Sequence, residues 1–255
     1  LIKGVGFTGS ISGGRALFDL AAQRAEPIPV FAEMGSINPV VLLPKALKEN
    51  SQKWATAYAG SITLGAGQFC TNPGLLLAIK GSDLNHFAEQ LATAIESIAP
   101  SCMLHASMQA NFDNGSQKMQ EQNGVSKVAQ YQGVVQPNYG RQTVLKVDGN
   151  EFLKNKSLSH EVFGPFSMIV ECDDESQLIK LISELDGQLT GTIIGEDHEL
   201  NQHSDVIAAL QNRVGRLIFN GVPTGVEVCP AMIHGGPYPA SSDSRFTAVG
   251  IHAVY

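Results

Sequence analysis

The feature that most constrains the fold is an alternation of short apolar segments with longer segments of helical periodicity. Apolar runs at residues 28–32, 37–43 and 75–79 predict strands. Between and after them, residues 45–64 and 83–99 place apolar side chains at helical spacing. A strand–helix–strand repeat is the building block of parallel α/β sheets. The chain is therefore predicted to be an α/β protein with an open, mostly parallel sheet flanked by helices.

A second series of alternating segments follows a polar, Gln-rich region at residues 100–140, in which only a helix around 107–122 is predicted. The tail from residue 221 is rich in Gly, Pro and Ser and is expected to form loops over an existing surface. The second series comprises predicted strands at 142–148, 166–171, 189–194 and 216–220, and predicted helices at 175–185 and 198–213.

The first residues predict a strand–helix–strand unit of their own. A short strand within residues 2–10 runs into a Gly-rich turn, a helix is expected to open near Gly13, and a second strand stops at Glu33. Parallel α/β sheets bind ligands beyond the carboxyl ends of their strands. Gly9, Ser10 and Glu33 all fall at such ends, so they are candidate binding or catalytic residues.

Charge and composition exclude several classes of function. The 255-residue chain carries a net charge of −7, which argues against nucleic acid or an anionic membrane surface as the main partner. No apolar run approaches the ~20 residues that a membrane span needs. The four cysteines lie far apart with no metal-type spacing, so no metal site is predicted and the thiols are expected to be reduced. A cytoplasmic location is expected, and the missing initiator Met suggests a fragment of a longer protein.

One cysteine lies in an unusual setting. Cys70 falls within residues 65–74, where three glycines and a proline exclude regular helix or strand. The thiol is therefore expected on a constrained loop, where a substrate and backbone N–H groups can both approach it. Most cysteines are small buried apolar residues, so this loop alone does not identify a nucleophile.

Three further segments give Cys70 its significance. They are Phe-Thr-Gly-Ser at 7–10, Glu-Met-Gly at 33–35 and Glu-Val-Phe-Gly-Pro at 161–165. Together with Gly-Gln-Phe-Cys at 67–70, and in this order, they resemble the motifs of the aldehyde dehydrogenase superfamily. The resemblance covers essentially the whole chain and corresponds to roughly the carboxyl half of such an enzyme. One departure concerns the family's Glu-Leu-Gly-Gly box: this chain has Met34 in place of the Leu and Ser36 in place of the last Gly.

The resemblance implies a role for each matching residue. Cys70 resembles the family's nucleophile and Glu33 its general base. The first segment resembles the turn that meets the cofactor phosphates, and Glu161 resembles the carboxylate that holds the nicotinamide ribose. The implied site residues that contact the cofactor, either NADP or NAD, are Gly9, Ser10, Glu161 and Phe163.

The implied reaction is oxidation of a small-molecule aldehyde to a carboxylic acid. Cys70 would form a thiohemiacetal and then a thioester, and a water molecule activated by Glu33 would hydrolyse the thioester. Each residue also has an ordinary interpretation: Glu33 as a solvated strand-end carboxylate, Glu161 as a locally paired group, and the glycines near residue 9 as a simple tight turn.

His234 is a departure from the general family pattern. The segment His-Gly-Gly-Pro-Tyr-Pro at 234–239 resembles the branch that includes 2-oxoglutarate semialdehyde dehydrogenase and NADP-preferring fatty aldehyde dehydrogenases. Other members usually carry an aromatic residue at the position of His234. We hypothesise that His234 lies near Cys70 and tunes its thiolate or contacts substrate. The alternative is a solvated loop histidine.

The resemblance also divides the chain. Residues 1–33 would be a remnant of the dinucleotide-binding domain, residues 34–235 the catalytic domain, and residues 236–255 a segment that packs back on the cofactor side. The isolated chain is expected to be inactive, and its full-length parent a homodimer or homotetramer. Two rival functions remain: a cofactor-independent hydrolase that uses Cys70 with His234, and a non-catalytic binding module.

Overall fold

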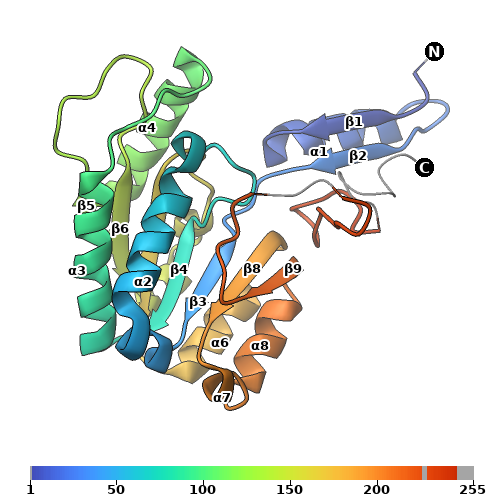
Figure 1. Ribbon diagram of the computed structural model, residues 1–255. Coiled ribbons are helices and arrows are strands. Elements are labelled where there is room, and N and C mark those ends of the chain that lie inside the picture. The colour runs from blue at the N-terminus through green and yellow to red at the C-terminus, as the bar shows by residue number, and fades with distance from the viewer. Residues whose placement is uncertain (1, 226–228, 246–255) are drawn as a thin grey trace.

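Residues 2–225 and 229–245 are described by a computed structural model, which contains two separate sheets (Figure 1). The smaller sheet pairs β1 (Val5–Thr8) with β2 (Val30–Glu33) in parallel, and α1 (Ile11–Ala22) connects these strands. This unit extends away from the larger sheet. The chain passes from one sheet to the other directly after β2, so Glu33 lies at the junction between them.

The larger sheet has seven strands in the order β5-β6-β7-β4-β3-β8-β9. All neighbours are parallel except β5 and β6, which are antiparallel. The predicted open, mostly parallel α/β sheet is therefore confirmed. The strands are β3 (Pro39–Leu42), β4 (Leu75–Ile79), β5 (Ser126–Gln130), β6 (Thr143–Asp148), β7 (Phe166–Cys172), β8 (Gln188–Ile194) and β9 (Val214–Phe219).

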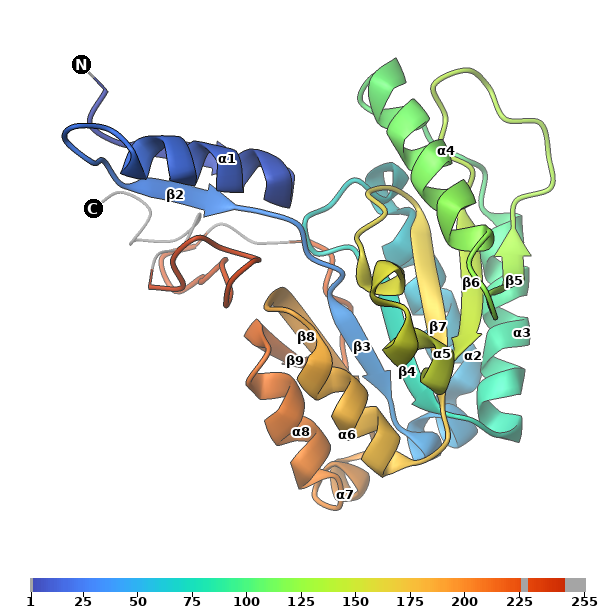
Figure 2. The same cartoon turned by 180° about the vertical axis from the view of Figure 1, so that it is seen from behind.

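Helices cover both faces of this sheet (Figures 1 and 2). The long helices α2 (Pro44–Thr63) and α3 (Ser82–Ser97) lie on one face. The other face carries α4 (Ala106–Gln120), α5 (Gly149–Lys154), α6 (Glu175–Glu184) and α8 (Ser204–Gln211).

The sheet has an apolar core on each face. Successive side chains of a strand point to opposite faces. Accordingly, Val40 and Leu42 of β3 belong to the core beneath α2 and α3, whereas Val41 between them belongs to the core on the opposite face. All three side chains are buried.

Four sequence predictions differ from the structure. Strand β5 and the six-residue helix α5 are not predicted from the sequence, although both are present. The helix predicted for 198–213 is interrupted after α7 (Asp197–Leu200) and resumes as α8. Helix α1 begins at Ile11 rather than near Gly13, because the side chain of Ser10 caps its N-terminus.

Over the described ranges, the structure has no helix of the length and apolarity that crossing a membrane requires.

The C-terminal segment lies along the exposed edge of β2. The backbone N–H of Met34 donates to the carbonyl of Ala240 at 2.8 Å, and that of Ser242 donates to the carbonyl of Ala32 at 2.8 Å. The Ser242 hydroxyl accepts from the N–H of Ala32 and donates to the carbonyl of Val30. These bonds hold residues 240–242 against the smaller sheet. Residues 246–255 of the predicted C-terminal segment lie outside the described residues.

Candidate active site

Cys70 lies on a tight turn that follows helix α2. The turn begins in a short 3-10 helix (Leu64–Gly67) in which Gly65, Ala66 and Gly67 have φ values of 55°, 57° and 65°. Glycine adopts this left-handed region without penalty, which explains two of the three residues. Gly67 is also packed against another loop, because a Cβ atom there would lie 2.2 Å from the carbonyl carbon of Gly164. The turn is therefore fixed in both shape and position.

Asn38 fixes the other end of this turn. Its side-chain amide group donates to the carbonyl oxygens of Cys70 and Asn72, each at 2.9 Å. Its Oδ1 atom accepts hydrogen bonds from the hydroxyls of Ser36 and Thr190. Asn38 is almost fully buried, so these four bonds replace the contacts it would make with water.

Sequence reasoning missed Asn38. The available signal was an Asn-Pro pair at the start of an apolar strand, where a buried polar residue needs partners. The positive φ of Asn38, 47°, is a second sign of a specialised position, but it is visible only in the structure.

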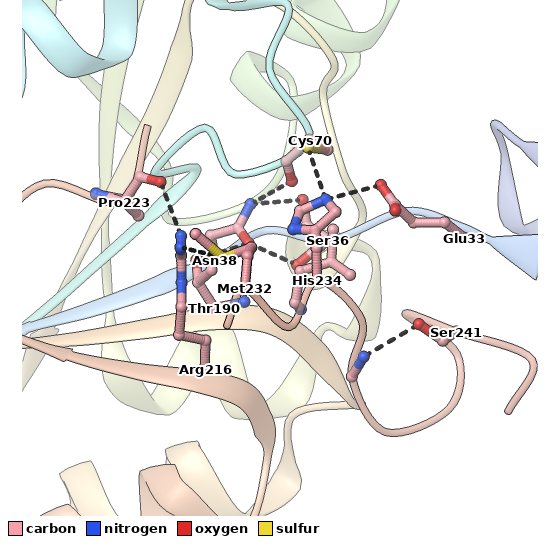
Figure 3. Close-up of polar contacts among 12 residues, drawn as sticks. Glu33, Ser36, Asn38, Cys70, Thr190, Arg216, Pro223, Met232, His234 and Ser241 are labelled. Carbon is pink, nitrogen blue, oxygen red and sulfur yellow. Dashed lines mark hydrogen bonds and ion pairs between the residues drawn. The ribbon is translucent and has the colours of Figure 1, made fainter. Parts of the chain in front are cut away.

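Three predicted catalytic residues meet at one point (Figure 3). The Nε2 atom of His234 lies 3.1 Å from the sulfur of Cys70 and 3.1 Å from Oε1 of Glu33. The sulfur, the imidazole nitrogen and the carboxylate oxygen all lie within 4.8 Å of one another. Glu33 and His234 are 8% and 7% exposed, and Cys70 is half-buried. The structure thus brings Cys70, Glu33 and His234 together from segments far apart in the sequence.

The two neighbours of His234 control its protonation. Hydrogen bonds that the imidazole makes with Cys70 and Glu33 raise the pKa of His234 to about 9, although its burial acts in the opposite direction. The imidazole is therefore protonated at neutral pH, and its Nε2–H group faces both the sulfur and the carboxylate. This arrangement suits a thiolate, which is the reactive form of cysteine.

The backbone explains how His234 reaches the site. Gly235 packs directly on strand β9, since a Cβ atom on Gly215 would lie 1.7 Å from the carbonyl oxygen of Gly235. The N–H of Gly236 donates to the Ser241 hydroxyl at 3.0 Å. Ser241 in turn forms an antiparallel bridge with Glu33. The segment that carries His234 is therefore attached to both sheets.

Glu161 and Phe163 lie together on a second side of the site. Both line a small pocket beside Gly67 and Asn72 of the turn that carries Cys70. Glu161 reaches the segment that follows Glu33, because a Cβ atom on Gly35 would lie 2.7 Å from its Oε2 atom. Desolvation of the Glu161 carboxyl raises its pKa, and a hydrogen bond from the backbone of Ser36 acts in the opposite direction.

Gly9 and Ser10 lie next to the backbone of Glu33, outside the cluster that Cys70, Glu33 and His234 form. The N–H of Gly9 donates to the backbone carbonyl of Glu33 at 3.0 Å. The hydroxyl of Ser10 accepts from the N–H of Gly13 and so caps α1. Helix geometry leaves the first N–H groups of α1, at Ile11 and Ser12, free for an anionic ligand. Ser10 therefore has a structural role as the cap of α1, and its contact with a cofactor stays a prediction.

Comparison with known proteins covers almost the whole chain. The model of the aldehyde dehydrogenase family matches residues 1–238. The chain is 41% identical over 255 residues to alpha-ketoglutaric semialdehyde dehydrogenase of Acinetobacter baylyi, covering 100% of this chain and 48% of that protein. It is 43% identical over 253 residues to alpha-ketoglutaric semialdehyde dehydrogenase 2 of Azospirillum brasilense, covering 99% of this chain and 48% of that protein. The chain thus spans about half the length of these curated relatives.

Solved structures show the same fold. Gamma-glutamyl-gamma-aminobutyraldehyde dehydrogenase of Burkholderia cenocepacia superposes with a TM-score of 0.77 at 20% identity, covering 99% of this chain and 50% of that one. An indole-3-acetaldehyde dehydrogenase complexed with NAD+ gives 0.79 at 19% identity, with the same coverage. With a family match over nearly the entire sequence and two relatives above 40% identity, the chain belongs to the aldehyde dehydrogenase family.

Proposed function

We propose that the full-length protein containing this chain oxidises an aldehyde to a carboxylic acid with NAD(P)+. The observation that supports this proposal most directly is the contact of His234 with both Cys70 and Glu33, each at 3.1 Å. A thiol, a proton carrier and a carboxylate within reach of one carbon atom are the groups that thioester formation and hydrolysis require.

In the first stage, the Cys70 thiolate adds to the aldehyde carbon and forms a thiohemiacetal. A backbone N–H of the Cys70 turn donates to the developing oxyanion, which typically lowers the barrier by about 3–4 kcal/mol. Protonated His234 lies beside the sulfur, with its Nε2 atom 3.1 Å away. Loss of hydride from the thiohemiacetal carbon leaves a thioester on Cys70.

In the second stage, the Glu33 carboxylate takes a proton from a water molecule, which attacks the thioester carbon. The carboxylic acid leaves and the thiolate is restored. Glu33 is suited to this task because its Oε1 atom lies within 4.8 Å of the sulfur. Its hydrogen bond with His234 at 3.1 Å keeps the carboxylate directed toward the site.

The residues on the cofactor side fit a dinucleotide. The N-terminus of α1 lies next to the exposed residues Gly9 and Ser10, and an N-terminus of this kind attracts phosphate. Glu161 presents a solvent-accessible carboxylate that can accept hydrogen bonds from ribose hydroxyls, and Phe163 lines the same pocket. When bound, NAD(P)+ accepts the hydride. NADP or NAD is proposed without a preference between them.

The two curated relatives, of which the chain spans about half the length, are named for alpha-ketoglutaric semialdehyde. We therefore propose a short-chain semialdehyde of this type as the substrate. The experiment is a panel of aldehydes with NAD+ and NADP+ on the full-length protein, with Cys70→Ser as the control. Cofactor reduction that Cys70→Ser abolishes supports the proposal, whereas reduction that survives this substitution contradicts it.

Residues 1–33 are proposed as the cofactor side, residues 34–235 as the catalytic domain, and residues 236–255 as a segment returning to the cofactor side. On this proposal, the isolated chain oxidises little or no aldehyde, and the full-length protein assembles as a homodimer or homotetramer. Rapid NAD(P)-dependent oxidation by the purified 255-residue chain would contradict the first statement. Light scattering on the full-length protein tests the second.

A second candidate function follows from the Cys70–His234 contact alone. In a cofactor-independent hydrolase, Cys70 would be the nucleophile and protonated His234 the proton donor. Hydrolysis of p-nitrophenyl acetate distinguishes the two: ester turnover with no aldehyde oxidation on either cofactor would favour the hydrolase.

A further inference from the structure

Arg216 is a cation that the proposed catalytic steps do not use. It lies on β9, opposite Thr190 of β8, and its side chain is half-buried. Figure 3 shows its guanidinium group among the residues that surround Cys70 and His234. The group is close enough to the Cys70 sulfur to interact with it electrostatically.

Among the described residues, the guanidinium group makes only weak hydrogen bonds. Its terminal nitrogens meet the sulfur of Met232 and the carbonyl oxygen of Pro223, each at 3.5 Å, which is the outer limit of a hydrogen bond. Its Nε atom is inaccessible to solvent and has no hydrogen-bond partner within residues 2–225 and 229–245. No carboxylate among the described residues forms an ion pair with Arg216.

A guanidinium charge without a charged partner lowers the stability of a folded chain. Buried charges are ordinarily paired, because removing a charge from water without compensation is unfavourable. Met232, one of its two neighbours, precedes His234 by two residues, so the unpaired charge lies next to the segment that completes the site. Guanidinium groups bind planar carboxylates through two parallel hydrogen bonds.

We propose that Arg216 binds the carboxylate at the far end of the substrate and so selects semialdehydes of dicarboxylic acids over neutral aldehydes. This inference rests on the proposed function, because it assumes that the aldehyde end of the same molecule reacts at Cys70. A carboxylate ligand would supply the partner that the Nε atom lacks. Arg216 is thus a specificity-determining residue on the wall of the site.

The test compares 5-oxopentanoate with pentanal, two five-carbon aldehydes that differ by the terminal carboxylate. On the full-length protein, Arg216→Gln is expected to lower the ratio of kcat/KM for 5-oxopentanoate to that for pentanal by about 10- to 100-fold. The change is expected mainly in KM, because the interaction is made equally in the bound and transition states. Arg216→Lys should restore part of the ratio.

Arg213→Gln is the matched control, since Arg213 immediately precedes β9 and donates to the carbonyl oxygen of Ser183 away from the site. This variant should leave the ratio unchanged. An Arg216→Gln protein with an unchanged ratio would overturn the proposal. Equal losses for both aldehydes with slower alkylation of Cys70 would also overturn it, because Arg216 would then act on the sulfur.

A binding measurement separates failure of this inference from failure of the proposed function. Glutarate should slow the alkylation of Cys70 by iodoacetamide in the unsubstituted protein and fail to do so in Arg216→Gln. If no aldehyde is oxidised but this protection occurs, the anion site stands and the oxidation proposal falls. If aldehydes are oxidised but glutarate gives no Arg216-dependent protection, the inference about Arg216 is wrong.

Discussion

At the scale of single residues, the site depends on one imidazole nitrogen that serves two partners. The Nε2 atom of His234 faces both the Cys70 sulfur and the Glu33 carboxylate, so one proton links the nucleophile to the proposed base. A protonated histidine in contact with both of these groups has a measurable effect on the free energy of unfolding.

We expect replacement of His234 by Gln to change how stability depends on pH. The folded pKa of about 9 lies above the ordinary value of 6.5, so the charged imidazole stabilises the fold fully below about pH 6.5. This contribution, up to about 3 kcal/mol, is lost as the pH rises through about 9. Urea unfolding at pH 6 and pH 9.5 should show a large difference between His234→Gln and the unsubstituted protein at pH 6 and a small one at pH 9.5. Equal differences at both pH values would contradict this charge state.

Asn38 provides a second test at the residue scale. Asn38→Asp keeps the size of the side chain and tolerates its positive φ, but it turns a carboxylate oxygen toward the carbonyls of Cys70 and Asn72. We expect a loss of about 2–4 kcal/mol in the free energy of unfolding and slower alkylation of Cys70. Unfolding and alkylation measured on the same sample check both effects. Unchanged alkylation would show that Asn38 does not position the nucleophile.

At the scale of secondary structure elements, the site depends on the turn that joins α2 to β4. Gly67→Ala should destabilise the protein by about 2 kcal/mol or more, because a Cβ atom there meets the Gly164 backbone at 2.2 Å and φ is +65°. Gly60→Ala is the matched control. Gly60 is exposed within α2, and its Cβ would meet nothing within 4 Å, so this variant should gain about 0.5–1 kcal/mol. Thermal unfolding of both variants tests the pair, and equal effects would contradict the described turn.

The elements also show what the sequence could predict. Strands β3 and β4 are short apolar runs and α3 has regular apolar spacing, so local pattern was sufficient for them. Strand β5 was missed because Ser126–Gln130 is a mostly polar edge strand, in which only Ala129 is fully buried. Its strand conformation comes from pairing with β6, and a single sequence does not show that contact.

At the scale of the whole molecule, the site forms where distant segments converge. Glu33 comes from the end of the small sheet, Cys70 from a turn at the larger sheet, and His234 from the C-terminal segment. Motif order predicted the three residues, because each motif is local. The support from Asn38 and the position of Arg216 near Cys70 were not predicted, since both depend on proximity between segments more than 30 residues apart in the sequence.

The central claim, that Cys70 carries the substrate as a thioester which Glu33 helps to hydrolyse, is tested most directly by Glu33→Gln in the full-length protein. Mixed rapidly with aldehyde and NAD(P)+, this variant should reduce about one cofactor per site and then stop. Mass spectrometry should find the acyl group on the peptide that contains Cys70. Steady turnover at the unsubstituted rate, or an acyl group on any residue other than Cys70, would contradict the account.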